Sequence, residues 1–210
     1  MKISILTIFP DFFPPTLAEG MIRAAREKER LTVETGDRSL LDDFYHVFAQ
    51  NMRDLGTPVF PKAMFERALT LEPCRGRVFV VRLNDRPVAA AMALAWRDSV
   101  LVPWASSLRQ YRSLCANMFL YWSMIKGAIE EGYATFDFGR STAGGGTHQF
   151  KQQWGAEDVP LHWEYASGTR DYVPSTSTDH KAMTVAIQCW QRLPLRVANA
   201  AGPLLIRLIP

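Results

Sequence analysis

The sequence contains little cysteine, and its cysteines are not arranged as a site. The 210 residues include 3 Cys, namely Cys74, Cys115 and Cys189, which are widely spaced and form no CxxC pair. This spacing excludes a small disulfide scaffold and a cysteine zinc site. We therefore expect a reduced, cytoplasmic setting and no bound metal, with each cysteine serving as a small core residue.

Long apolar runs are absent as well. No stretch of about 18 consecutive apolar residues occurs, so we expect no transmembrane segment. The start, MKISILTIFPDFFPP, has one lysine before an apolar run that Pro10 and Asp11 interrupt, and no small-residue cleavage site follows. We interpret this start as a buried strand rather than a signal peptide.

Neither sign of charge dominates. The 24 Lys and Arg residues against 21 Asp and Glu residues give a net charge of +3, with a pI near 8.8. This mild excess permits a nucleic-acid partner without requiring one. With 48% hydrophobic and 21% charged residues, the chain has the balance of a folded globular protein and not of a disordered one.

The apolar tail over residues 193–210 carries Arg196 and Arg207. Two interpretations are open. The tail packs against its own domain, which we favour, or it lies as an amphipathic segment on a membrane surface, which would place the protein at the inner face of the membrane.

Periodicity and turn residues predict an alternating order of elements. Strands are expected at 3–9, 31–35, 77–83, 88–96, 99–106, 135–139 and 160–166, and helices at 14–29, 40–56, 61–71, 113–131, 148–154 and 179–192. This order predicts an α+β fold with a central mixed, largely antiparallel sheet flanked by helices. It resembles the GNAT acyltransferase fold. We divide the chain into a strand–helix extension (1–30), the GNAT-like domain (31–168) and a loop with a helical tail (169–210).

The segment FDFGRSTAGGGTHQFKQQWG (136–155) joins a strand end, a flexible loop and a helix start. Ligands often bind where such elements meet. Lys151 lies between Phe150 and Trp154 and could hold a phosphate or stabilise an oxyanion, unless it is an ordinary solvated lysine. Asp137 could act as a base or orient a nucleophile, or it could merely cap the loop or pair with Arg140.

Other residues of the segment give weaker indications. Gly144, Gly145 and Gly146 would let a ligand approach the backbone closely, although the P-loop and GxGxxG patterns are absent. His148 is expected to be a satisfied loop histidine. Trp104 and Trp154 are candidates for lining a substrate groove, with core packing as the default.

Several motifs in order resemble the FemAB-type proteins. They are FYHVFAQNMRDLGTPVFPKAMFE (44–66), FVVRLNDRPVAAAMAL (79–94), WASSLRQYRSLCANMFLYW (104–122), GYATFDFGRSTAGGGTHQFKQQWGA (132–156) and VPLHWEY (159–165). The resemblance is strongest to the branch associated with PEP-CTERM/exosortase exopolysaccharide systems.

The resemblance implies a GNAT-like enzyme that transfers an amino acid from aminoacyl-tRNA to an amine of a peptidoglycan precursor or a related exopolysaccharide precursor. The FK motif of that family corresponds to Phe150 and Lys151, with the lysine assisting transfer. Asp137 is our candidate for handling the proton. Arg140, the three glycines, Trp104 and Trp154 are expected to contact substrate, and no tightly bound cofactor is expected.

The sequence departs from the family in three ways. The junction ASSLRQYRSLCANMF lacks the glycines of the loop with which acyl-CoA-dependent GNAT enzymes bind pyrophosphate. FemAB proteins usually carry two GNAT-like domains, and the resemblance covers only the second, C-terminal one. Residues 1–20 resemble the start of TrmD-type tRNA methyltransferases instead. Two alternatives therefore stay open: an acyl-CoA-dependent N-acyltransferase, and a non-catalytic half-protein with a binding or assembly role.

Overall fold

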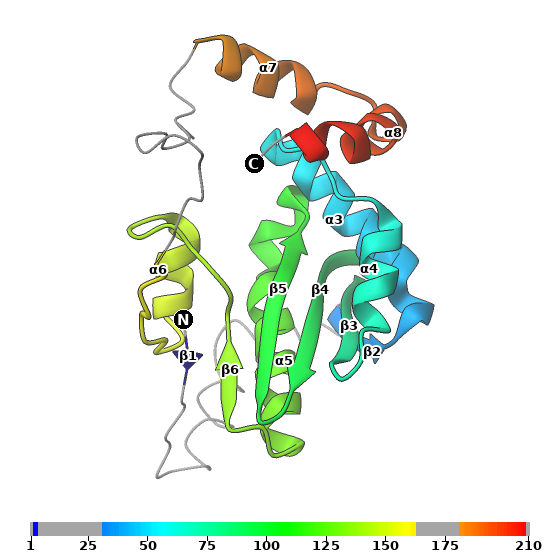
Figure 1. Cartoon of the computed structure of the whole chain (residues 1–210). Helices are drawn as coiled ribbons and strands as arrows, with labels where there is room; N and C mark the ends of the chain where they lie inside the picture. Colours follow the sequence, from blue (N-terminus) through cyan, green and yellow to red (C-terminus); the bar gives the residue numbers. More distant parts are fainter. Residues whose placement is uncertain (1, 4–30, 163–180, 209–210) are drawn as a thin grey trace.

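The computed structural model describes residues 2–3, 31–162 and 181–208 (Figure 1). The helix expected at 14–29 lies outside the described residues, as do most of the strand expected at 3–9 and residues 163–166 of the last expected strand.

One mixed sheet forms the centre of the fold. Its strands are β1 (Lys2–Ile3), β2 (Leu31–Gly36), β3 (Arg75–Leu83), β4 (Arg86–Trp96), β5 (Ser99–Ser107) and β6 (Thr135–Asp137). They lie in the order β1-β6-β5-β4-β3-β2. Every neighbouring pair is antiparallel except β5 and β6, which are parallel. The predicted α+β fold with a largely antiparallel mixed sheet is confirmed.

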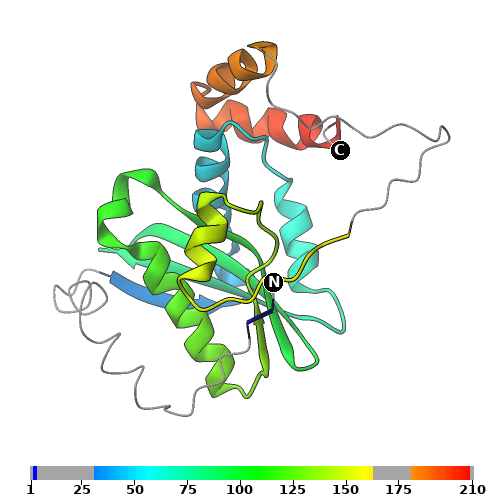
Figure 2. The same cartoon turned by 90° about the vertical axis from the view of Figure 1, so that its left-hand side faces the viewer.

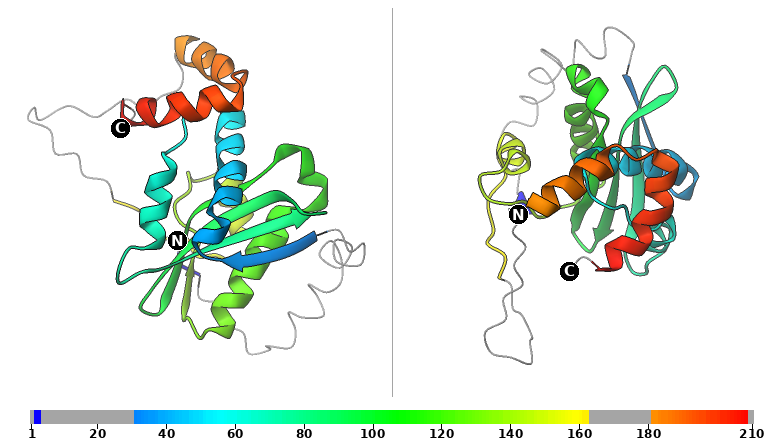
Figure 3. Two further views of the ribbon diagram at one scale, coloured as in Figure 1. Left: turned by 90° about the vertical axis from the view of Figure 1, so that its right-hand side faces the viewer. Right: turned by 90° about the horizontal axis from the view of Figure 1, so that it is seen from above.

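Helices cover both faces of this sheet. The helices are α3 (Leu41–Leu55), α4 (Lys62–Leu69), α5 (Ala116–Glu130), α6 (Gly146–Gln152), α7 (Lys181–Gln191) and α8 (Leu195–Leu205), with short 3₁₀ turns η1 (Arg38–Leu40), η2 (Arg109–Leu114) and η3 (Ile206–Leu208). Figure 2 looks at the β1–β6 edge and shows α6 in front of the sheet. Figure 3 (left) looks at the opposite edge, with β2 and α3 in the foreground.

The alternation of side chains along the strands divides the core in two. On β3, Val78 and Val80 pack with the apolar side chains of α3 and α4. Phe79 and Val81 point to the other face and pack with those of α5. Because neighbouring residues of a strand face opposite sides, a sheet covered on both faces needs apolar residues at successive positions. This explains the uninterrupted run in VFVV.

Helix α3 ends at a glycine whose position could not be occupied by a residue with a side chain. Gly56 adopts a left-handed conformation with φ +83°, which glycine tolerates best. A Cβ at this position would lie 2.4 Å from Cγ2 of Ile187 in α7. The end of α3 is therefore the seat of the C-terminal helices.

Two differences from the predicted elements bear on the site. Cys115 has φ +52°, so the helix expected at 113–131 is split into the 3₁₀ turn η2 and helix α5. The strand expected at 160–166 is wrong for its described part, because residues 160–162 form no strand and Leu161 is 58% exposed. Because no described neighbour covers Leu161, the burial of an apolar side chain that would favour a strand here is missing.

Candidate functional site

The strands β5 and β6 are paired over three residues and then separate. Their parallel register runs from Ser99 opposite Thr135 to Leu101 opposite Asp137, whereas β5 continues to Ser107. Pro103 has no backbone N–H, so it cannot donate to either neighbouring strand. The sheet therefore opens beyond Leu101, between the far end of β5 and the loop that follows β6.

A cleft of about 410 Å³ lies near this opening. Its lining comes from the end of β5, the turn η2, the first turns of α5 and the helix α6: Ala105, Ser107, Tyr111, Arg112, Cys115, Ala116, Asn117, Met118, Tyr121, Gly146, Thr147, Phe150 and Lys151. A cleft of this size can hold a small ligand or one end of a larger one.

Lys151 is buried beside the cleft, with 5% of its surface exposed. Its Nζ donates to the carbonyl oxygens of Gly139 at 2.8 Å and Arg140 at 2.9 Å. Burial lowers the pKa of this ammonium group, and the negative charge of Asp137 opposes that effect. Lys151 therefore is not the solvated helix lysine of the alternative interpretation. It is a cation held by two backbone dipoles at the wall of the cleft.

Asp137 shapes the loop that Lys151 holds. Its Oδ1 accepts a hydrogen bond from the backbone N–H of Gly139 at 2.7 Å. Gly139 has φ +69°, and a Cβ there would lie 3.0 Å from the carbonyl oxygen of Val102. Only glycine fits this close approach between the loop and β5. Asp137, Gly139 and Lys151 thus fix the turn by which the chain leaves β6.

The aromatic neighbours of Lys151 form a stack behind the cleft. Tyr121 stacks on Phe138 at a centroid distance of 5.3 Å and meets Phe150 edge-on at 5.1 Å. Phe150 in turn meets Trp154 at 6.4 Å. Phe150 lines the cleft, whereas the buried Nε1 of Trp154 has no hydrogen-bond partner. The stack keeps α6 against α5 and so fixes the position of Lys151.

The glycine-rich loop contributes one residue to the cleft. Gly146 lines it, and nothing lies within 4 Å of the place where its Cβ would be. Gly144 has φ +74° and donates its N–H to Nδ1 of His148 at 3.0 Å. The other ring nitrogen of His148 lies 2.8 Å from Oδ2 of Asp158. His148 is therefore hydrogen-bonded through both ring nitrogens, as expected from the sequence, although it lies in the first turn of α6 and not in the loop.

Two of the predicted site residues are placed elsewhere. Arg140 has an exposed side chain, and the residue takes part in the network through its carbonyl oxygen. Trp104 packs edge-on against Phe65 at 5.0 Å, in the core on the α3–α4 side. Val102, two residues earlier, faces the α5 side. A register shift between β4 and β5 reverses the alternation between these residues.

The cleft also contains residues that the sequence did not single out for chemistry. Tyr121 is 6% exposed, and burial raises the pKa of its hydroxyl to about 12. Arg112 and Cys115 lie at the junction between η2 and α5. In the sequence Tyr121 is one of the apolar and aromatic residues of the helix expected at 113–131, a signal that every core aromatic of a helix shares. Among the described residues, no group of three His, Cys, Asp or Glu side chains could hold a metal ion.

Several solved structures with a similar fold are acetyltransferases. An aminoglycoside acetyltransferase from an uncultured soil metagenomic sample, in complex with sisomicin, matches with a TM-score of 0.54 at 12% identity, covering 67% of this chain and 98% of the other. The ribosomal-protein-S18-alanine N-acetyltransferase of Escherichia coli matches with a TM-score of 0.53 at 15% identity, covering 62% and 79%.

A third structure was solved with CoA. It is the aminoglycoside N-acetyltransferase AAC(6')-Iy, which matches with a TM-score of 0.51 at 12% identity, covering 66% of this chain and 95% of the other. At these identities the likeness establishes the fold. No curated protein sequence matches the chain.

A family model described as "Acetyltransferase (GNAT) domain" matches residues 17–152. This range includes the whole central meander, α5, β6 and α6, and with them every residue that lines the cleft. The chain therefore belongs to the GNAT acetyltransferase domain family.

Proposed function

We propose that this protein transfers an acyl or aminoacyl group to an amine, or a hydroxyl, of a cell-envelope or exopolysaccharide precursor, as a FemAB-type member of the GNAT family and of its PEP-CTERM/exosortase-associated branch. The observation that carries the proposal is the buried ammonium group of Lys151 at the wall of a cleft that opens where β5 and β6 separate. We place the reaction on the cytoplasmic side, at the inner face of the membrane.

The proposed chemistry is an attack by the acceptor amine on the carbonyl carbon of the donor. A C–N bond forms, and the carbonyl oxygen becomes a tetrahedral oxyanion that Lys151 stabilises by its charge. The bond from the carbonyl carbon to the donor's oxygen or sulfur then breaks. In our proposal Tyr121, which lines the cleft, gives its proton to that leaving group and takes up the acceptor's surplus proton, a role for which the sequence had suggested Asp137. The negative charge of Asp137 raises the pKa of Lys151 and so favours the charged form of the ammonium group.

Aminoacyl-tRNA is the donor we favour. In acyl-CoA-dependent GNAT enzymes the junction after the last meander strand offers free N–H groups to the pyrophosphate. Here the N–H groups of Tyr111 and Cys115 are bonded within the turn, to the carbonyl oxygens of Leu108 at 3.0 Å and Arg112 at 3.1 Å. The glycine-free junction and the FemAB resemblance support a donor that is held by other means.

Acyl-CoA is the second candidate donor, because similar structures include a GNAT enzyme bound to CoA and to a CoA-containing bisubstrate analogue. Arg112 lines the cleft and would pair with a phosphate of either donor.

Direct binding measurements distinguish the donors. The full chain is titrated with acetyl-CoA by calorimetry and with a non-hydrolysable aminoacyl-tRNA analogue by fluorescence anisotropy. We expect saturable binding of the tRNA analogue, weakened by Arg112→Gln but unaffected by Arg67→Gln on α4. Stoichiometric binding of acetyl-CoA alone would replace our preferred donor with the second. Binding of neither would contradict the proposal and favour a non-catalytic role.

A further inference from the structure

The helices α7 and α8 expose large apolar side chains to solvent. Val185 is 57% exposed, Val197 48%, Leu204 66% and Leu205 40%. Exposed apolar residues are unremarkable when scattered singly, but a contiguous set indicates an interaction surface. We call these four residues, together with Arg192, Arg196 and Arg207, the α7–α8 outer face.

The other side of the two helices is firmly seated on the domain. Gly202 is buried, and a Cβ there would lie 2.9 Å from the backbone nitrogen of Val59. Arg53 Nη1 donates to the carbonyl oxygen of Leu193 at 3.2 Å, and Gln191 Nε2 donates to that of Asp54 at 3.2 Å. The outer face is therefore presented by helices with a fixed position, and its exposure does not arise from a detached tail.

Helical geometry separates the two sides of α8. Val197 and Leu204 are seven residues apart, which returns to the same side of an α-helix after two turns. Ala198 and Gly202, the buried residues of α8, are four residues apart and lie on a different side. Val197 and Leu204 thus form an apolar stripe along α8 on a side other than that of its buried residues, and Leu205 and Val185 of α7 are also left exposed.

The charge on this face has one sign. Arg192, Arg196 and Arg207 are exposed, and residues 181–208 include no Asp or Glu. Arg196 directly precedes Val197 in α8, and Arg207 lies in the turn η3 that follows Leu204 and Leu205, so one arginine lies near each end of the stripe. An apolar stripe with a basic margin fits a surface that offers hydrocarbon below a layer of negative charge, which is the surface of a bilayer with anionic lipids.

These helices are too short to enter a bilayer lengthwise. Eleven residues extend roughly 16 Å at 1.5 Å per residue, about half of a hydrocarbon core. In the part of the chain that the structure describes, no helix has the length and apolar character to cross a membrane. Contact along the outer face, parallel to the membrane plane, is the geometry that remains.

We propose that the α7–α8 outer face docks on an anionic lipid bilayer, with the apolar stripe in the headgroup layer and the arginines on lipid phosphates. Figure 1 places both helices beyond the end of the sheet towards which β5 runs, and Figure 3 (right) shows them lying across that end. Ser107, the last residue of β5, lines the cleft. Docking would therefore hold the cleft's end of the molecule towards the membrane. The proposal does not depend on the transfer reaction.

Co-sedimentation of the full chain with vesicles tests the docking. We expect binding to vesicles of phosphatidylglycerol and phosphatidylcholine, and at least about tenfold weaker binding to phosphatidylcholine alone. Raising the salt concentration should weaken binding to the mixed vesicles, because salt screens exposed charges. Equal binding to both vesicle types would contradict the role of the arginines, and no binding to either would overturn the proposal.

Matched variants locate the contact. Leu204→Glu should reduce vesicle binding by about tenfold or more, whereas Leu161→Glu, at a residue 58% exposed in another part of the chain, should leave it unchanged. Arg196→Gln should weaken binding to the mixed vesicles and Arg67→Gln should not. Arg196 and Arg67 are exposed, as are Leu204 and Leu161. None of the four substitutions should therefore impair folding, and thermal melts would check this.

A second copy of the chain is the competing occupant of this face. Light scattering after size exclusion, without vesicles, separates the two. A monomer whose vesicle binding is lost in Leu204→Glu supports the proposal. A dimer that Leu204→Glu converts to a monomer would overturn it, because the face would then be an interface between copies.

Discussion

At the residue scale, Lys151 is the group whose role is most open to test. Replacement by alanine removes the buried cation and both hydrogen bonds to the loop. We expect the rate of acyl transfer to fall by about 100-fold or more, the usual effect of deleting an oxyanion-stabilising group. Lys126→Ala is the matched control, because Lys126 is an exposed lysine that pairs with Glu130 at 3.5 Å. Undiminished transfer by Lys151→Ala would remove Lys151 from the mechanism.

The pH dependence of the transfer rate distinguishes a catalytic charge on Lys151 from a purely structural role in holding the loop. Burial lowers the pKa of this ammonium group, so the charge is lost at a pH below the ordinary lysine range. If the charge stabilises the oxyanion, the initial rate should fall as pH rises through that lowered pKa. Lys151→Arg keeps its charge at such pH and should not show this fall. A rate that rises over the same range would mean that the neutral amine acts as a base.

Tyr121 offers a test of proton transfer. Tyr121→Phe preserves the ring contacts with Phe138 and Phe150 and removes only the hydroxyl. We expect single-turnover rates to fall by about 10- to 100-fold, with little change in stability. Tyr45→Phe is the control. It removes a hydroxyl that donates to the carbonyl oxygen of Phe60 at 3.0 Å, which should cost about 1 kcal/mol of stability and leave transfer unchanged.

Failure of this contrast would be informative. If both tyrosine variants transferred at the wild-type rate, the leaving group would take its proton from water or from another group, and Tyr121 would be a packing residue of the stack.

At the element scale, α8 is held by one close contact. Gly→Ala inside a helix normally stabilises by up to about 1 kcal/mol, but at Gly202 the added Cβ would meet the Val59 backbone. Gly202→Ala should therefore destabilise the seat of α8, whereas Gly127→Ala in α5, where nothing lies within 4 Å of the new Cβ, should stabilise the fold. Urea denaturation measures the change in the free energy of unfolding for each variant, and we expect opposite signs. Stabilisation by Gly202→Ala would contradict the close seating of α8.

The sequence predicted most elements because their signals are local. Helix α3 has acidic residues in its first turn and Gly56 after its last residue. The turn at Asn84 and Asp85, both with positive φ, follows from residues that tolerate that conformation. The break at Cys115 could not be predicted, because cysteine carries no preference for a left-handed conformation.

The candidate site was predicted less completely, for reasons of register. The FK motif led to Phe150 and Lys151, and both line the cleft. Trp104 was misplaced because its side of the sheet depends on a register shift between β4 and β5, which a single sequence does not reveal. The bonds from Lys151 to the carbonyl oxygens of Gly139 and Arg140 depend on how α6 packs on the loop, which is also invisible in local spacing.

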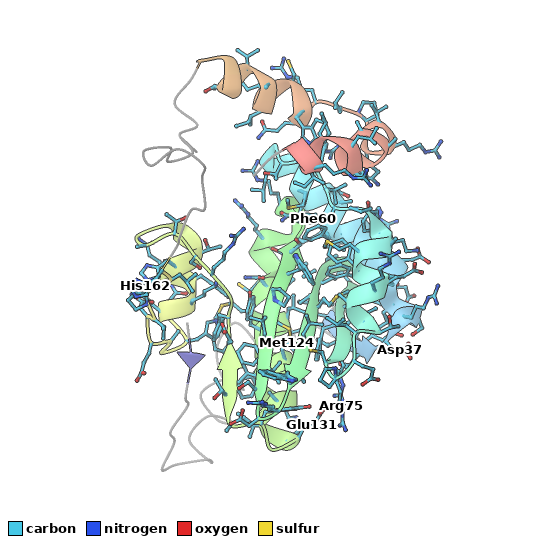
Figure 4. All side chains as sticks on the ribbon, viewed as in Figure 1. Asp37, Phe60, Arg75, Met124, Glu131 and His162 are labelled. Atoms are coloured by element: carbon cyan, nitrogen blue, oxygen red, sulfur yellow. The ribbon has the colours of Figure 1, made fainter. Side chains whose placement is uncertain are left out.

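At the scale of the whole molecule, the tail packs on the domain and leaves part of its apolar surface exposed. Ala198 and Gly202 pack against the domain, as we favoured from the sequence. Leu204 and Leu205 nevertheless stay exposed. The two ends of the sheet also differ: Arg75 and Glu131 lie at the end away from α7 and α8 (Figure 4), where they line, together with Met124, a small pocket of about 30 Å³. The cleft with Lys151, not this pocket, has room for a reacting group.

The central claim is that acyl transfer takes place in the cleft lined by Lys151, and blocking that cleft tests it most directly. Gly146→Phe would place a ring in the cleft, while Gly127→Phe would place one at the small pocket at the other end. At both positions nothing lies within 4 Å of the new Cβ. The measurement is single-turnover transfer by the two folded variants, with the donor identified by the binding experiments. We predict that Gly146→Phe loses transfer and Gly127→Phe retains it; full transfer by Gly146→Phe would contradict the claim.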